Sequence, residues 1–268
     1  MKDITIVTSL QDIRRHNMDG RKWGEYLDWF AVTLQIKSPM VVFVDEDLVD
    51  FVKGYRVGQK TEIITEKLED VPFYKYKDRM DEIIASEDYQ KRIADAPRIE
   101  CQHSLYSIIQ FSKFWWVKEA VSRNYFDSDF YFWMDAGLSR FFYDMDISQN
   151  YPGEEARKQL ETIKDKVLIQ VSMFPYQDLY NAKVLGEDYL LNNRSYVMGG
   201  MFGVGKEKID ELCGLVEQTF EKLLDDGIVN NEQIVLGYLF KKHPDLFIEF
   251  INDLRIHRGY ELIVELSK

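Results

Sequence analysis

The chain has 268 residues, of which 46% are hydrophobic and 14% aromatic, and its formal net charge at pH 7 is −12. This length and composition are typical of a folded protein with a sizeable core and exclude a disordered chain. The acidic balance argues against broad nucleic-acid binding and against attraction to anionic membranes, because both need clustered Lys and Arg.

Neither the cysteines nor the apolar runs indicate an extracellular or membrane-spanning protein. Cys101 and Cys213 are the only two cysteines, and they do not have metal-ligand spacing or require a disulfide. The chain begins directly in a β-rich run, and no run approaches ~18 apolar residues. We therefore expect a cytoplasmic protein without a transmembrane segment, and the sequence leaves its oligomeric state open.

The N-terminal quarter predicts a parallel βαβ unit. ITIVTSL at 4–10 is rich in strand-forming residues, and MVVFV at 40–44 is a continuous apolar run typical of a strand buried on both faces. Between them, residues 23–34 carry apolar side chains at helical spacing. A strand, a helix and a second buried strand favour parallel pairing, and TEIIT at 61–65 predicts a third strand.

The rest of the chain extends this pattern into one α/β domain over residues 1–268. Residues 66–100 are charge-rich and predict exposed loops and short helices, as an insertion with the composition of a mobile flap. Strands are predicted at 130–135, 167–173, 195–205 and 246–251, and helices at 103–123, at 206–224 and from Asn230 or Asn231 to Pro244. No repeat or linker divides the chain, so we expect a mostly parallel, mixed sheet flanked by helices.

The residues that follow the buried strands are the first candidates for chemistry, because ligands of open α/β sheets bind beyond the carboxyl ends of parallel strands. Asp135 ends the run FYFWMD, and Ala136 and Gly137 leave room for a ligand beside the backbone. A carboxylate there can hold a divalent cation, Mn²⁺ or Mg²⁺, that binds phosphate. The alternative is an Asp that caps a tight turn.

Three further features each allow a structural and a functional interpretation. The paired glycines of YVMGGMFGVG at 196–205 mark either a bulge needed for packing or a close ligand contact. Glu232 in NNEQ is either a helix-start acid favoured by the helix dipole or a catalytic group. Lys113, in a long aromatic helix, either extends to solvent or reaches a phosphate.

Several enzyme classes lack their motifs in this sequence. The histidines show no metal-ligand pattern, and G-x-S-x-G, P-loop and H-E-x-x-H motifs are absent. No G-x-G-x-x-G follows the first strand, which disfavours a dinucleotide-binding Rossmann enzyme.

Taken in order, these segments resemble nucleotide-sugar glycosyltransferases of the GT-A fold. ITIVTSLQDIRR and HSLYSIIQFSKFWWVKEAV…FYFWMDAGLSRF look like the bacterial HtrL/YibB family, which is assigned to glycosyltransferases by fold-level similarity. YVMGGMFGVG, the following amphipathic helix, NNEQ and KKHP resemble the ABO-type α-galactosyl and N-acetylgalactosaminyl transferases.

The resemblance implies transfer of a sugar from a nucleotide-diphosphate sugar, UDP being favoured, to a hydroxyl of a glycan or glycolipid, with retention. It implies Glu232 as the catalytic acid, and Asp135, with His257 as a further candidate, as metal ligand. The implied donor-binding residues are Thr8, Asp12, Arg14, Lys113, Asp135, Ala136 and Gly137. The implied donor and acceptor cleft is lined by Met198, Gly199, Gly200, Met201, Phe202 and Gln233.

One departure from the family pattern concerns the metal, because Gly137 stands where the D-x-D motif has its second acid. Either Asp135 holds a cation together with another group, or no metal is required and basic side chains neutralise the leaving diphosphate. The candidates for the second role are Lys113, Arg14, Arg15, Arg140 and Arg258.

Two other function classes stay open. The incomplete D-x-D motif fits a non-catalytic sugar- or nucleotide-binding protein on a degenerate GT-A scaffold. A nucleotidyltransferase ranks third, because TSLQDIRRHNMDG has no glycine cluster after the first strand. The HtrL/YibB likeness further implies a surface-polysaccharide or lipopolysaccharide acceptor, reached at the inner membrane face.

Overall fold

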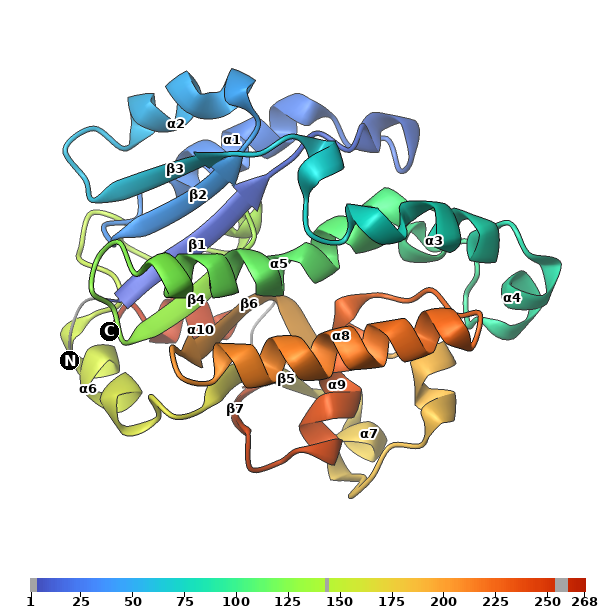
Figure 1. The fold of residues 1–268 in the computed structure, drawn as a ribbon. Coiled ribbons are helices and arrows are strands. Elements are labelled where there is room, and N and C mark those ends of the chain that lie inside the picture. The colour runs from blue at the N-terminus through green and yellow to red at the C-terminus, as the bar shows by residue number, and fades with distance from the viewer. Residues whose placement is uncertain (1–3, 143–144, 254–259) are drawn as a thin grey trace.

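The computed structural model describes residues 4–142, 145–253 and 260–268, which form one α/β domain around a seven-stranded sheet (Figure 1). The strands are β1 (Ile4–Leu10), β2 (Met40–Val44), β3 (Thr61–Thr65), β4 (Phe130–Met134), β5 (Val167–Phe174), β6 (Val197–Gly205) and β7 (Phe247–Asp253). Their order is β3-β2-β1-β4-β6-β5-β7. Only β6 is antiparallel to its neighbours, β4 and β5, so the predicted mostly parallel, mixed sheet is confirmed.

The helices cover both faces of the sheet. They are α1 (Trp23–Thr33), α2 (Val49–Tyr55), α3 (Lys77–Ile84), α4 (Glu87–Arg92), α5 (Ser104–Arg123), α6 (Glu154–Thr162), α7 (Gln177–Asn181), α8 (Ile209–Asp225), α9 (Glu232–Lys242) and α10 (Glu261–Glu265). One apolar core joins the sheet to α5, α8 and α9, and a second joins it to α1, α6 and α10. Within the described ranges, no helix has the length and apolar character needed to cross a membrane.

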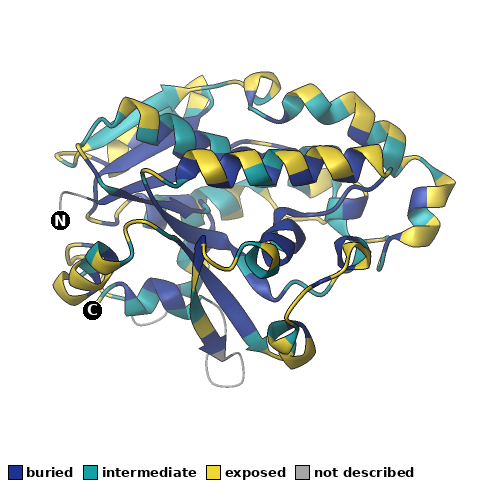
Figure 2. Ribbon diagram, turned by 60° about the horizontal axis from the view of Figure 1, so that its bottom comes forward, coloured by how far each residue is buried: buried dark blue, intermediate teal, exposed yellow. Residues whose placement is uncertain are grey.

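Because helices cover both faces of the sheet, continuous apolar runs in the sequence form strands within it. Every residue of β1, β2 and β4 is buried, because the pleat sends alternate side chains into the two cores. Figure 2 shows the result, a dark sheet under helices that are buried on one side and exposed on the other.

The helix starts reflect local capping. The predicted helix at 206–224 begins later, at Ile209, because residues 206–208 turn the chain out of β6. At the start of α9, Asn231 Oδ1 accepts a hydrogen bond from the backbone N–H of Ile234 at 3.1 Å, as predicted for an N-cap. Helix α6 went unpredicted, since only Ala156 and Leu160 on it are buried.

Residues 66–100 form short helices and turns, among them α3 and α4. Val71, Phe73 and Met80 anchor the segment in the core, and α3 packs on α5 and α8. The mobility predicted for this segment stays a prediction.

Candidate active site

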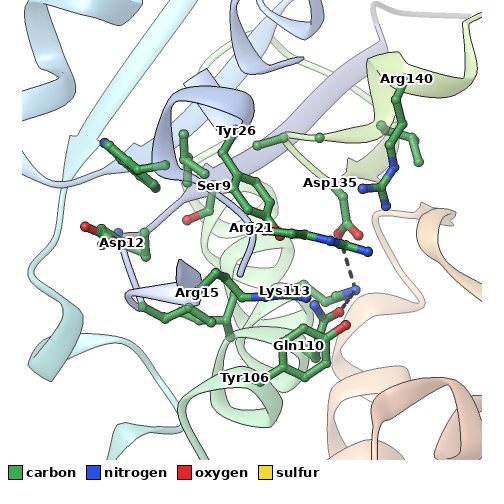
Figure 3. Close-up of a pocket in the computed structure, with 18 of the residues that line it drawn as sticks. Ser9, Asp12, Arg15, Arg21, Tyr26, Tyr106, Gln110, Lys113, Asp135 and Arg140 are labelled. Atoms are coloured by element: carbon green, nitrogen blue, oxygen red, sulfur yellow. Dashed lines mark hydrogen bonds and ion pairs between the residues drawn. The ribbon is translucent and has the colours of Figure 1, made fainter. Parts of the chain in front are cut away.

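A cavity of about 130 Å³ opens beyond the carboxyl ends of β1 and β4 (Figure 3). Its wall is made by residues 9–13 at the end of β1, by the loop and helix start between 15 and 26, by one face of α5, by residues 133–140 at the end of β4, and by Tyr260. The fold thus brings together five parts of the chain at the edge where the sequence predicts a ligand.

The cavity wall is rich in positive charge, with Arg15, Arg21, Lys113 and Arg140 all lining it. In Figure 3 the guanidinium groups of Arg21 and Arg140 turn toward the part of the cavity that holds Asp135. Concave surfaces of one sign concentrate ions of the opposite sign, so this wall favours an anionic ligand in a protein that is acidic overall.

The loop after β1 neutralises some of this charge internally. Arg15 Nε donates to Asp19 Oδ1 at 3.3 Å, its Nη2 pairs with Oδ2, and its guanidinium lies 4.8 Å from the Tyr106 ring centroid. The hydrogen bond from Arg15 holds the pKa of Asp19 below its ordinary value. Arg21 Nε lies 3.6 Å from the same carboxylate.

Arg140 differs from these two arginines, because among the described residues it has no ion pair. Its guanidinium lies 5.1 Å from the Trp29 ring centroid and 4.9 Å from that of Phe141. Held by aromatic faces, Arg140 offers its hydrogen-bond donors to a ligand.

Lys113 forms the inner wall and is only 1% exposed. Its Nζ donates to Glu232 Oε1 at 2.8 Å, to the Gly199 carbonyl at 3.0 Å and to Gln110 Oε1 at 2.7 Å, and lies 3.4 Å from Asp135 Oδ1. The Lys113 side chain therefore does not extend to bulk solvent, which was one of the two interpretations from the sequence. The ammonium group sits between two carboxylates at the cavity.

The protonation of this cluster follows from its burial and its charges. Burial lowers the pKa of Lys113, but Asp135 and Glu232 outweigh that effect, so the pKa is raised and the side chain is an ammonium ion. Burial raises the pKa of Glu232, and the attraction of Lys113 only partly offsets it. We conclude that Lys113 is charged and that burial disfavours ionisation of Glu232 relative to a carboxyl group in water.

Asp135 is the carboxylate of this cluster that faces the cavity. Its side chain is 35% exposed. Its Oδ1 accepts a hydrogen bond from Trp133 Nε1 at 2.6 Å in addition to the Lys113 contact, and its backbone N–H donates to the Gly200 carbonyl at 2.8 Å. These bonds fix one carboxylate oxygen and orient the group toward the ligand space.

Glu232 lies behind Lys113 and does not form part of the cavity wall. It is 1% exposed, and its Oε2 has no hydrogen-bond partner within the described part of the chain. A Cβ atom at position 199 would lie 2.1 Å from Glu232 Oε1, so only glycine leaves room for this carboxylate. Strand β6 also bulges here, since residues 199–201 are skipped in its pairing with β5.

The predicted site residues fall into four groups. Asp12, Lys113, Asp135, Ala136 and Gly137 line the cavity. Arg14 lines a second, adjoining hollow of about 640 Å³, which shares residues 11–13 and Trp23 with the first. Arg258 and the metal candidate His257 lie outside the described residues.

The remaining predicted residues do not reach the cavity. Thr8, Met201 and Phe202 are 0% exposed, because β1 and β6 are interior strands covered on both faces. Gly199 and Gly200 are also buried, and Met198 and Gln233 do not belong to the cavity wall. The structure therefore places the double-glycine strand beside the Lys113 cluster, one layer below the ligand space.

Sequence reasoning missed several wall residues, including Arg21, Tyr26, Tyr106, Gln110 and Tyr260. One signal was available. Tyr106, Gln110 and Lys113 recur at spacings of four and three residues, which places three polar groups on one face of an otherwise apolar helix.

The donor groups around Asp135 do not fit a metal site held by the protein. Across the described ranges, no three His, Cys, Asp or Glu side chains are grouped so that they could hold a metal ion. The nearest charged group to Asp135 is the Lys113 ammonium, at 3.4 Å, which occupies the side of the carboxylate where a second cation would be repelled. The predicted Mn²⁺ or Mg²⁺ stays a prediction, and no chemistry below depends on it.

The fold and cavity define an α/β protein that has a cavity lined by cationic side chains beyond the carboxyl ends of its parallel strands. The chain belongs to the HtrL/YibB family, described as bacterial proteins of unknown function, whose family model matches residues 2–256. It is 22% identical over 259 residues to Protein HtrL of Escherichia coli (strain K12), covering 91% of this chain and 86% of that protein. This confirms the predicted HtrL/YibB resemblance.

Among solved structures, the chain is similar to apo mouse xyloside xylosyltransferase 1. The two share 11% sequence identity with a TM-score of 0.43, over 93% of this chain and 84% of the other.

Proposed function

We propose that the protein is a glycosyltransferase that moves a sugar from a nucleotide-diphosphate sugar to a hydroxyl of a glycan or glycolipid. The observation that carries this proposal is the composition of the cavity wall. Four cations line it together with the carboxylates of Asp12 and Asp135 and several aromatic side chains. A nucleotide-diphosphate sugar matches this wall, since its anionic diphosphate suits the cations and its sugar hydroxyls suit a carboxylate.

The charges match the demands of the reaction. In glycosyl transfer the sugar carbon becomes positive while the leaving diphosphate gains negative charge. Arg140, with its donors unpaired, and Lys113 would stabilise the leaving group, and Asp135 would face the sugar. Such preorganised charges act strongly because the site is partly closed to water.

Glu232 is proposed in an indirect role. Its carboxylate is shielded by Lys113, whose ammonium group also donates to Gln110, so contact with a donor sugar would require Lys113 to move. In the present arrangement it holds Lys113 in place. The ABO-type likeness, and with it UDP as donor nucleotide and retention of configuration, rests on the sequence motifs alone.

The adjoining hollow is proposed to receive the nucleoside. It lies next to the cationic cavity and contains Asp45, Asp12 and Tyr74, which offer carboxylates for ribose hydroxyls and an aromatic face for a base. A membrane-bound polysaccharide or lipopolysaccharide acceptor at the cytoplasmic face stays a proposal from the family resemblance.

The test is release of UDP from a panel of UDP-sugars by the purified protein, with and without candidate acceptors. We expect turnover with at least one sugar, lost in Asp135→Asn and retained in the surface control Asp146→Asn. Stabilisation by a UDP-sugar without any turnover would support the non-catalytic binding protein instead. If no nucleotide sugar is turned over and none stabilises the protein, the glycosyltransferase and the non-catalytic binding protein are both contradicted.

A further inference from the structure

Two buried tryptophans connect the cavity with a carboxylate that follows β3. Glu66 Oε2 accepts a hydrogen bond from Trp116 Nε1 at 2.6 Å. The Trp116 ring stacks on Trp133, with centroids 5.6 Å apart and ring planes inclined by 13°. Trp133 Nε1 in turn donates to Asp135 Oδ1 at 2.6 Å. Each contact joins the next, from the end of β3 to the end of β4.

The middle of this chain of contacts has no room to adjust independently. Trp116 is 0% exposed and Trp133 is 2% exposed, and Phe43 packs on Trp116 with its centroid at 5.9 Å. In a close-packed core, a displaced ring displaces its neighbours. A change at Glu66 that releases Trp116 is therefore passed to Trp133 and to the hydrogen bond that orients Asp135.

We propose that Glu66 is a positioning residue for Asp135, acting through the stacked pair Trp116 and Trp133. As a carboxylate, Glu66 accepts a charge-assisted hydrogen bond that holds the Trp116 indole tightly. As a neutral acid it accepts a weaker bond, and Asp135 is then held less firmly. That Asp135 contacts a ligand rests on the proposed function. The contacts that link Glu66 to Asp135 through the two tryptophans do not depend on it.

The surroundings of Glu66 raise its pKa, so that its carboxylate becomes protonated near neutral pH. Burial raises its pKa to about 7, although the hydrogen bond from Trp116 opposes the shift, and the negative charges of Glu119 and Asp70 raise it further. The side-chain amide of Gln11, which lines the cavity, donates to the Glu66 backbone carbonyl at 3.3 Å. Asp135 is therefore held most firmly above pH 7.

The first experiment follows intrinsic tryptophan fluorescence of the ligand-free protein between pH 5.5 and 8.5. We expect a transition near pH 7 in the wild type and none in Glu66→Gln, which keeps the shape of the side chain. Trp116→Phe removes the bond that lowers the pKa, so the Glu66 transition should move to higher pH.

The matched control is Glu217→Gln. Glu217 also accepts a hydrogen bond from an aromatic residue, the Tyr76 hydroxyl at 3.3 Å, but does not contact the tryptophan pair. This variant should keep the wild-type transition. A wild-type transition in Glu66→Gln would overturn the proposal and assign the signal to another group.

The second experiment measures the dissociation constant of UDP-glucose against pH by calorimetry. Its diphosphate keeps its charge over this range, so the protein supplies the pH dependence. We expect affinity to fall roughly fivefold from pH 8 to pH 6 in the wild type, the factor for one weakened hydrogen bond, and a flat profile in Glu66→Gln. Equal pH profiles for the two proteins would overturn the positioning role. If UDP-glucose binds neither protein, it is excluded as the donor while the sugar-nucleotide panel still tests the proposed function, and fluorescence alone decides whether the network responds to Glu66.

Discussion

Lys113 Nζ and Glu232 Oε1 lie 2.8 Å apart, and each side chain is only 1% exposed. The ion pair joins the long helix α5 to the first turn of α9 across β6. Removing one partner of a buried pair leaves the other charge without compensation, which costs far more than the pair contributes. Here Lys113 compensates two carboxylates, since Asp135 lies 3.4 Å from the same ammonium group.

Lys113→Met should therefore destabilise the protein by about 3–5 kcal/mol, measured by urea unfolding. Lys118→Met is the matched control on the same helix, because Lys118 pairs with Asp210, whose side chain is 79% exposed. Its loss should cost no more than about 1 kcal/mol. Similar values for the two variants would contradict a charged cluster around Lys113.

The second prediction concerns the room left for Glu232. Gly199→Ala places a methyl group 2.1 Å from the present position of Glu232 Oε1, so the carboxylate or β6 must shift, at a cost of about 1–3 kcal/mol. Gly214→Ala is the control, since its Cβ would meet nothing within 4 Å on helix α8 and should stabilise by about 0.5–1 kcal/mol. If alanine were tolerated equally at both positions, Glu232 would not be packed against this strand.

The third prediction is a pH dependence of stability that Glu66 causes. Because burial raises its pKa to about 7 in the folded state, its contribution to stability is complete below its ordinary value of 4.5. That contribution is lost as pH rises through about 7. The melting temperature of Glu66→Gln relative to wild type should thus be higher at pH 8.5 than at pH 5, by ~3 °C. A difference that does not change with pH would show that Glu66 does not titrate there.

Much of the fold could be predicted because β1, β2 and β4 are short runs buried on both faces, and β3 is rich in strand-forming residues. The runs at 4–10, 40–44 and 61–65 became strands with the predicted bounds. Asp135 lies at the predicted edge of the sheet because it follows a parallel strand, whereas Lys113 and Glu232 come from helices α5 and α9. The sequence could not indicate that Lys113 would turn inward and cover Glu232. That outcome depends on the balance between burial and ion pairing in three dimensions.

The fourth prediction concerns Arg140, the cavity arginine with no ion pair among the described residues. Arg140→Gln removes a charged donor group from the ligand space, so the dissociation constant of UDP-glucose should rise about tenfold. Arg123→Gln, at an exposed Arg whose side chain pairs with Glu119, is the control and should leave binding unchanged. Calorimetry at two salt concentrations checks the cause, because the loss should shrink as salt screens the phosphate contact.

The last prediction concerns metal removal. Asp135 has Lys113 at 3.4 Å, and no described set of three acidic, His or Cys side chains surrounds it. Under the proposed function we therefore expect cationic side chains, and not a metal ion, to neutralise the diphosphate. UDP-glucose should therefore raise the melting temperature equally in EDTA and in added Mn²⁺. Lys113→Met should abolish that shift under both conditions, since it removes the cation that the site provides. Stabilisation that occurs only with Mn²⁺ would instead make Asp135 a metal ligand, and the lysine a structural partner of Glu232.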